Sequence, residues 1–222
     1  MFFKNKKNQY GHTAEILVRE GYSDSYMAAL DNVLQNVSKA SDIAEGCCYK
    51  ACAHLFRGEL DSAYDRFAEI NKRSLPVIIS QSYAANYLLC LFLLNKFREA
   101  DELYESCNNI LLEDNNLLMR RSVGIHQFIR GNFDAALTVF IKAGKEAGRL
   151  QDSSASMLML DICIVRTLVK LDMYPQAADY CSAFSRYDNL DKLGDIVRKL
   201  KKNVFDNVSN EKKVKMIKGR KK

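Results

Sequence analysis

The feature that most constrains the fold of this chain is an internal repeat that occurs five times at nearly constant spacing. Each copy has a residue suited to a tight turn, then a small or apolar residue five positions later, and apolar residues four and three positions further on. The copies are Gly21, Tyr26, Leu30 and Val33; Gly58, Ala63, Phe67 and Ile70; Asn95, Ala100, Tyr104 and Cys107; Gly131, Ala136, Phe140 and Ala143; and Asp172, Ala177, Cys181 and Phe184. The turn residues are 37, 37, 36 and 41 residues apart. This regularity predicts one structural unit repeated along the chain.

Each position of the pattern has a physical role in a pair of helices. Gly, Asn and Asp tolerate the left-handed backbone conformation that ends one helix before another begins. The steps of four and three residues place the apolar positions on one face of the following helix. A helix-length apolar stretch precedes every turn, and a small residue stands seven positions before three of the turns. Each unit is therefore predicted to be an αα-hairpin whose helices, A and B, cross closely.

The pattern resembles the tetratricopeptide repeat (TPR) family over about residues 11–187. The resemblance rests on the small residues of helix A, the turn residues, the helix B alanines, the aromatic residues Phe67, Tyr104 and Phe140, and the small Ala143. The family's Trp near the start of helix A is absent, the period is 36–37 rather than about 34 residues, and the inter-repeat Pro survives only as Pro76. The resemblance implies an all-α fold, namely a right-handed α-solenoid of about five TPR-like helical hairpins with a C-terminal capping helix.

In the family that the chain resembles, the A helices line a concave face that binds peptides. Carried over by register, the resemblance implies a partner-binding groove formed by Cys48, Tyr49, Cys52, Asn86, Leu89, Arg121, Ser122 and Ile125. A mixed, partly apolar groove suits an amphipathic helix or an extended segment of a protein partner. The alternative is that the chain's own terminal helix fills these positions.

The charge of the chain is divided between its body and its ends. The net charge is +6, but residues 1–10 carry +3 and residues 198–222 carry +9, so the body between them carries −6. We expect residues 1–10 to be a basic N-terminal segment, 188–206 a capping helix with one apolar stripe, and 207–222 a basic flexible tail. The tail residues that could bind a polyanion are Lys212, Lys213, Lys215, Lys218, Arg220, Lys221 and Lys222.

This tail supports an alternative function, in which the chain is a subunit of a ribonucleoprotein or nucleic-acid-associated complex and docks through its basic end. The tail has no aromatic residue on which bases could stack, which weakens the case for specific single-strand recognition. A short basic end is more often simply solvated.

Composition indicates a helical protein in a reducing compartment. The chain has only 2 prolines in 222 residues, and its 7 cysteines are an odd number. The N-terminus lacks the apolar core of a secretory signal, so we expect reduced thiols and a cytoplasmic location. The most apolar window, residues 84–94, is much shorter than the roughly 20 residues that span a bilayer, which predicts a buried helix and no transmembrane segment. The sequence leaves the oligomeric state open.

The sequence contains no recognisable catalytic motif. Phosphate-binding, dinucleotide-binding, zinc-protease and nucleophile-elbow patterns are all absent, and His12, His54 and His126 lie far apart. Cys48 and Cys52 are one helical turn apart and could bind Zn²⁺, but packing in the core is the favoured interpretation. We therefore expect no enzymatic activity, no cofactor and no metal. The predicted function is a non-enzymatic TPR-like scaffold or adaptor that binds a peptide or helix of a partner protein in its concave groove.

Overall fold

The computed structural model describes residues 10–112, 116–149, 154–184 and 191–219, and every regular element among them is helical. The predicted N-terminal segment therefore lies almost entirely outside the described residues. The elements in chain order are α2 (Gly11–Glu20), α3 (Asp24–Asn36), α4 (Ala40–Phe56), α5 (Leu60–Glu69), the short 3₁₀-helix η1 (Lys72–Ser74), α6 (Val77–Leu93), α7 (Phe97–Leu112), α8 (Leu117–Ile129), α9 (Phe133–Arg149), α10 (Ser154–Lys170), α11 (Tyr174–Ala183) and α12 (Asp191–Gly219).

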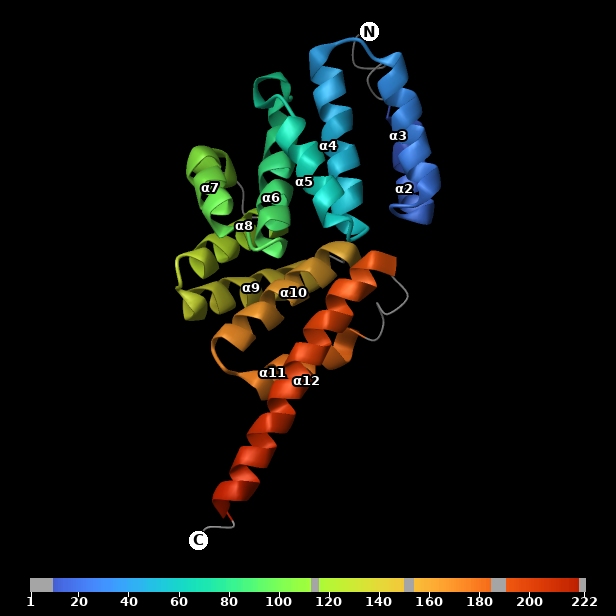
Figure 1. The fold of residues 1–222 in the computed structure, drawn as a ribbon. Helices are drawn as coiled ribbons and strands as arrows, with labels where there is room; N and C mark the ends of the chain where they lie inside the picture. Colours follow the sequence, from blue (N-terminus) through green and yellow to red (C-terminus); the bar gives the residue numbers. More distant parts are fainter. Residues whose placement is uncertain (1–9, 113–115, 150–153, 185–190, 220–222) are drawn as a thin grey trace.

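The helices pair as the sequence predicts, into the hairpins α2–α3, α4–α5, α6–α7, α8–α9 and α10–α11 (Figure 1). The backbone φ angle is positive at all five predicted turn residues: 66° at Gly21, 79° at Gly58, 60° at Asn95, 79° at Gly131 and 56° at Asp172. In the described part of the chain, no other residue has a positive φ. The five-hairpin organisation is thus confirmed at the level of individual backbone angles.

The left-handed backbone at these turns leads to a prediction about stability. Replacing Gly131 with alanine is expected to lower the free energy of unfolding by about 1–2 kcal/mol, because a Cβ atom disfavours the left-handed conformation. A Cβ at this position would meet no atom within 4 Å, so backbone strain alone is tested. Gly11→Ala is the matched control, since its Cβ also meets nothing within 4 Å and Gly11 has no positive φ. Urea unfolding measures both variants, and equal stability of the two would contradict the assignment.

The residues that repeat in the sequence pattern are buried where the helices pack together. The helix B alanines Ala63, Ala100, Ala136 and Ala177 are all fully buried. The aromatic positions four residues beyond them are buried as well, including Phe67 and Phe140. In the first hairpin, by contrast, the small helix A residue Ala14 is exposed. An end unit has a neighbour on one side only, which explains the weaker pattern there.

Helix α6 lies at the centre of the molecule. From Tyr83 to Leu93 every residue except the half-buried Tyr87 is buried, which confirms the predicted buried helix. Pro76 is the N-cap of α6, and Pro175 lies in the first turn of α11, so both prolines mark helix starts. In the part of the chain that the structure describes, no helix combines the length and apolar character needed to cross a membrane.

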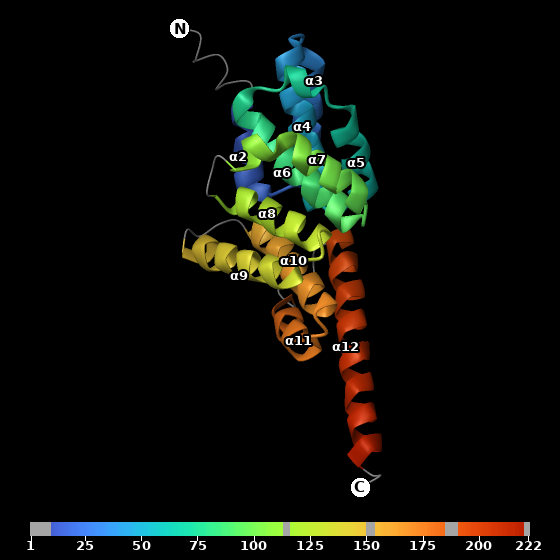
Figure 2. The same ribbon diagram turned by 90° about the vertical axis from the view of Figure 1, so that its left-hand side faces the viewer.

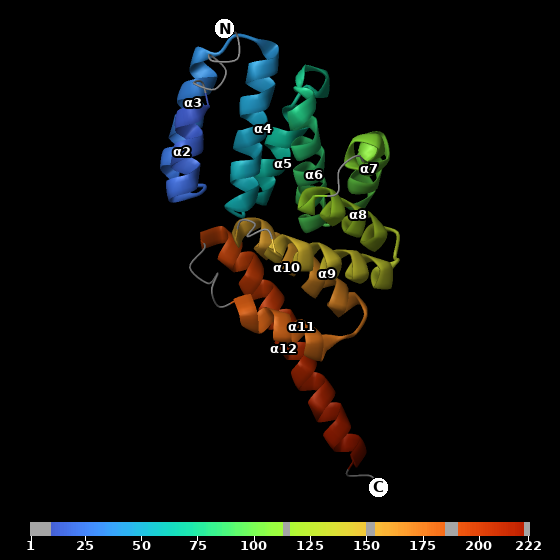
Figure 3. The same ribbon diagram turned by 180° about the vertical axis from the view of Figure 1, so that it is seen from behind.

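The direction of the stack changes at the third and fourth hairpins. Helices α2–α6 stand side by side, whereas α9 and α10 run across the lower ends of α4 and α6 (Figures 1 and 3). Arg166 of α10 holds this arrangement by donating hydrogen bonds to the carbonyl oxygen of Phe92, at 2.8 Å, and to the side chain of Asn95. Its guanidinium also lies 4.2 Å from the centre of the Phe92 ring. The fifth hairpin therefore contacts the third directly, although the fourth lies between them in the chain.

Helix α12 is longer than the predicted capping helix. It runs without a break from Asp191 to Gly219, so the backbone shows no boundary at residue 206 between a cap and a flexible tail. No Pro or Gly occurs between Gly194 and Gly219, so nothing in the sequence stops the helix earlier. Its first half packs on α11 and α10, with Val197 and Val204 buried. Its second half extends beyond the hairpins (Figure 2).

Candidate functional site

The residues predicted to line a partner-binding groove lie in the interior. Those buried are Cys48, Cys52, Asn86, Leu89, Arg121, Ser122 and Ile125. Tyr49 is half-buried, and the ring of Tyr10 packs edge-on against it with ring centres 5.3 Å apart. In this structure all of these side chains except Tyr49 are buried, so they offer little surface to a partner.

The predicted positions nevertheless meet one another across three helices. Arg121 of α8 donates to Asn86 Oδ1 of α6 at 2.9 Å, and Asn86 Nδ2 donates to Cys52 Sγ of α4 at 3.4 Å. These three predicted positions therefore lie next to one another, in a buried contact between helices. Residues three and four apart share a helix face, and the face that packs on the next repeat has the same spacing as the concave one.

Two of the three thiols of α4, those of Cys48 and Cys52, belong to this buried contact. A hydrogen bond with Cys52, followed by desolvation, raises the pKa of Cys48 well above its usual range. Burial likewise raises the pKa of Cys90 to about 12 and that of Cys163 to about 12. All seven cysteines of the chain are free thiols in the structure. The buried thiols with these raised pKa values are therefore protonated and unreactive in the folded state.

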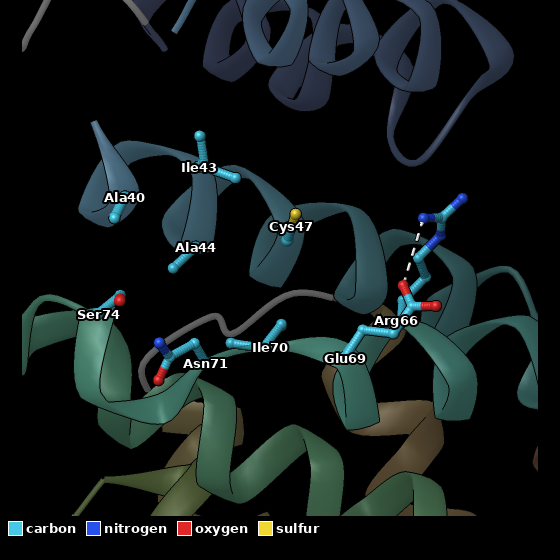
Figure 4. A pocket seen from close by; sticks show the side chains of 9 residues that line it. All are labelled: Ala40, Ile43, Ala44, Cys47, Arg66, Glu69, Ile70, Asn71 and Ser74. Atoms are coloured by element: carbon cyan, nitrogen blue, oxygen red, sulfur yellow. Dashed lines mark ion pairs between the residues drawn. The ribbon is translucent and has the colours of Figure 1, made fainter. Parts of the chain in front are cut away.

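An open pocket lies instead between α4 and the segment that joins α5 to α6 (Figure 4). We call it the α4–η1 pocket, and it has a volume of about 260 Å³. Its lining residues are Ala40, Ile43, Ala44, Cys47, Arg66, Glu69, Ile70, Asn71 and Ser74. Figure 4 shows Ala40 and Ala44 facing Ile70, Asn71 and Ser74, with the ion pair of Arg66 and Glu69 at one end. Most of this lining is apolar.

Exposed apolar residues also follow the pocket residues closely in the chain. Val77 and Ile78, at the start of α6, are 88% and 81% exposed, and Ile43, at the start of α4, is 39% exposed. Val77 follows the pocket residue Ser74 by only three positions. Sequence reasoning missed this surface, although a signal was present. The buried face of α6 needs Ile79 and Tyr83, so the apolar residues at 77 and 78 have no role in the core.

A second group of polar residues joins α7 to α8. His126 Nε2 of α8 lies 3.4 Å from Asp101 Oδ1 and 3.4 Å from Glu105 Oε1, both of α7. Arg130 places its Nε 3.0 Å from Asp101 Oδ1 and its Nη2 3.0 Å from Glu105 Oε1. We call these four residues the Asp101 cluster. Sequence reasoning missed it as well, because the carboxylates and the imidazole stand on different helices.

The predicted polyanion-binding residues lie where side chains are not described. The structure describes the backbone of α12 through Gly219, but it places no side chain from Lys212 onward. Binding of nucleic acid by this segment therefore stays a prediction.

Comparison with known proteins adds little beyond the general architecture. No family model matches the sequence, and no curated protein matches it. Solved structures similar to this chain include TPR-like repeats from Podosopora anserina assigned to a kinesin light chain, with 12% identity over 87% of this chain and 93% of that chain and a TM-score of 0.48. A variant of that protein with one substitution has 13% identity over 88% of this chain and 96% of that chain, with a TM-score of 0.49. Such low identity leaves function open.

The class of protein follows from the chain's own geometry. Five stacked αα-hairpins, each with a left-handed turn residue and most with a buried alanine at the helix crossing, make this an all-α helical repeat protein.

Proposed function

We propose that this protein is a non-enzymatic interaction scaffold that binds an apolar segment of a partner protein at the α4–η1 pocket and the adjoining residues Val77 and Ile78. The observation that carries the proposal is the exposure of these two side chains, at 88% and 81%, at the start of a helix that is otherwise almost entirely buried. Neighbouring exposed apolar side chains beside a concave surface are typical of protein-binding sites.

Two further observations fit a scaffold. Helical repeat proteins bind partners over extended surfaces, and the described residues present such a surface without closing it into a globule (Figures 1 and 2). Seven free thiols suit a reducing compartment, so the proposed place of action is the cytoplasm. The proposed site differs from the groove predicted from the sequence, whose residues are largely buried.

Replacing Val77 and Ile78 together with serine is expected to reduce recovery of partner proteins by about tenfold, because a loss of about 1.4 kcal/mol of apolar contact corresponds to that factor. The measurement is quantitative affinity capture from extracts of the source cells, with the tagged full chain as bait. Val18→Ser is the matched control, because Val18 is 89% exposed on α2, away from the pocket.

Both variants change side chains that are already exposed, so urea unfolding should show wild-type stability for each. The proposal fails if the double variant and the wild type recover the same proteins in the same amounts. It fails equally if Val18→Ser loses them to the same extent.

A further inference from the structure

We propose that Asp101, Glu105 and His126 form a binding site for a divalent transition-metal ion, which would join α7 to α8. The three side chains offer two carboxylate oxygens and one imidazole nitrogen, all within 4.8 Å of one another. Imidazole and carboxylate are the ligand types that such ions take in proteins. Asp101 and Glu105 are four residues apart on α7, so one helix face carries both carboxylates, and α8 supplies the imidazole.

The distances within the cluster suit coordination better than direct hydrogen bonding. Ligand atoms bound to tetrahedral Zn²⁺ at about 2.0–2.1 Å lie roughly 3.3–3.4 Å apart. The two separations from His126 Nε2 to the carboxylate oxygens are both 3.4 Å. Hydrogen bonds between nitrogen and oxygen are usually about 2.7–3.2 Å long, so the imidazole lies slightly too far away for either bond. The two carboxylate oxygens lie within 4.8 Å of each other, so small side-chain adjustments would let one ion contact all three atoms.

The imidazole is held in one orientation. Its ring stacks on the ring of Tyr104 with centres 4.0 Å apart and planes 7° from parallel. Arg130 Nε donates a weak hydrogen bond to His126 Nε2 at 3.4 Å, so a metal ion would have to displace Arg130 to reach this nitrogen. Metal ions bind the unprotonated nitrogen of an imidazole, and a fixed ring orientation reduces the entropy lost on binding.

Asp101 Oδ1 provides a further observation. This atom is shielded from solvent and accepts no hydrogen bond from any residue that the structure describes, although Arg130 Nε lies 3.0 Å away as an ion-pair partner. A buried carboxylate oxygen usually satisfies its lone pairs with well-directed donors. Here the oxygen has unused capacity, which a bound cation would take up.

Arg130 is the natural competitor for the site. Its guanidinium neutralises the carboxylates in the present arrangement, and its side chain is 49% exposed. It can therefore turn into solvent without leaving a buried charge. The two carboxylates and the guanidinium carry a formal net charge of about −1, and a divalent ion in place of Arg130 would neutralise the two carboxylates. Metal binding would thus exchange one cation for another of higher charge.

The site would connect the third hairpin to the fourth, where the direction of the stack changes. A metal ion held by α7 and α8 would stabilise this junction by the free energy of binding, because the unfolded chain does not hold the three ligands together. The inference is independent of the docking pocket, which lies between α4 and η1.

The test is calorimetric titration of the full chain with ZnCl₂ under reducing conditions. His126→Gln is expected to weaken binding by at least about tenfold, since it removes the imidazole ligand. Arg130→Gln is expected to tighten binding several-fold, because the competing cation is gone. Arg98→Gln is the control and should bind as the wild type does, because Arg98 is 93% exposed and pairs with Glu102 on its own helix.

Two independent measurements distinguish metal binding at this site from metal binding by the cysteines. Co²⁺ bound to the wild type should show an absorption spectrum without the thiolate charge-transfer band, since no cysteine is a proposed ligand. Zn²⁺ should also raise the urea midpoint of the wild type and leave that of His126→Gln unchanged. The proposal is overturned by a thiolate band, by absence of binding to the wild type, or by a Zn²⁺ affinity that neither His126→Gln nor Arg130→Gln alters.

Discussion

Replacing Gly124 with alanine is expected to lower the free energy of unfolding by about 1–3 kcal/mol, although alanine is the better helix former by about 1 kcal/mol. Gly124 lies where α8 crosses α9. A Cβ atom there would stand 2.3 Å from Cε1, 2.6 Å from Cδ1 and 2.9 Å from Cζ of Phe140. The Phe140 ring is fully buried, so it cannot move aside into solvent. The added methyl group must therefore force the two helices apart.

Gly144→Ala is the matched control for this prediction. Gly144 is also within a helix, but its Cβ would meet only one atom, Leu160 Cδ2 at 3.3 Å, which needs to shift by no more than a few tenths of an ångström. Its stability should stay near that of the wild type or rise, because alanine is favoured in a helix. Phe140→Leu should restore part of the loss in the Gly124→Ala background, and urea unfolding of the four proteins in the cycle gives the coupling. Equal stability of Gly124→Ala and Gly144→Ala would refute the close crossing.

Replacing Arg166 with methionine is expected to lower the free energy of unfolding by about 1.5–3 kcal/mol, the range for a hydrogen-bonded charged group. Methionine keeps the apolar stem of the side chain but cannot donate to the carbonyl oxygen of Phe92 or to the side chain of Asn95. The contact of the guanidinium with the Phe92 ring is lost at the same time. The Phe92 carbonyl, at the end of α6, would lose its charged donor.

The comparison variants for Arg166 test whether the link between α10 and α6 matters. Arg98→Met also removes an arginine, but one that is 93% exposed and pairs with Glu102 on its own helix, so its effect should be below about 0.5 kcal/mol. Arg166→Lys should fall between the two, because lysine keeps the charge without the paired donors. Unfolding by urea, followed by circular dichroism, measures all three. If Arg166→Met lowers the free energy of unfolding by no more than Arg98→Met does, the link between α10 and α6 contributes nothing to stability.

The sequence predicted the local geometry of the hairpins well. The turn residues, the buried alanines and the helix starts at Pro76 and Pro175 all follow from rules that act over a few neighbouring residues. A positive φ at Asn95 or Asp172 depends on the residue itself, so it is readable without knowing the rest of the fold.

The candidate sites were not predictable in the same way. Cys52, Asn86 and Arg121 were predicted to line one groove, and the structure joins them in a buried contact; which of the two forms depends on how far each hairpin rotates against the next. That rotation is set by packing between hairpins, and single residues do not encode it. The meeting of His126 with Asp101 depends on the same inter-hairpin geometry.

The distribution of the free thiols has a consequence for observing the motions of this protein. Buried cysteines occur in α4, α6, α7, α10 and α11, whereas Cys47, beside the α4–η1 pocket, is only half-buried. A thiol reagent reaches a buried sulfur only after the surrounding helices separate, so the labelling rate of each cysteine records how often its own hairpin opens. The chain thus carries, in its natural sequence, a set of reporters for local unfolding along the stack. Cys47, which is only half-buried, is expected to react with a thiol reagent fastest of the seven.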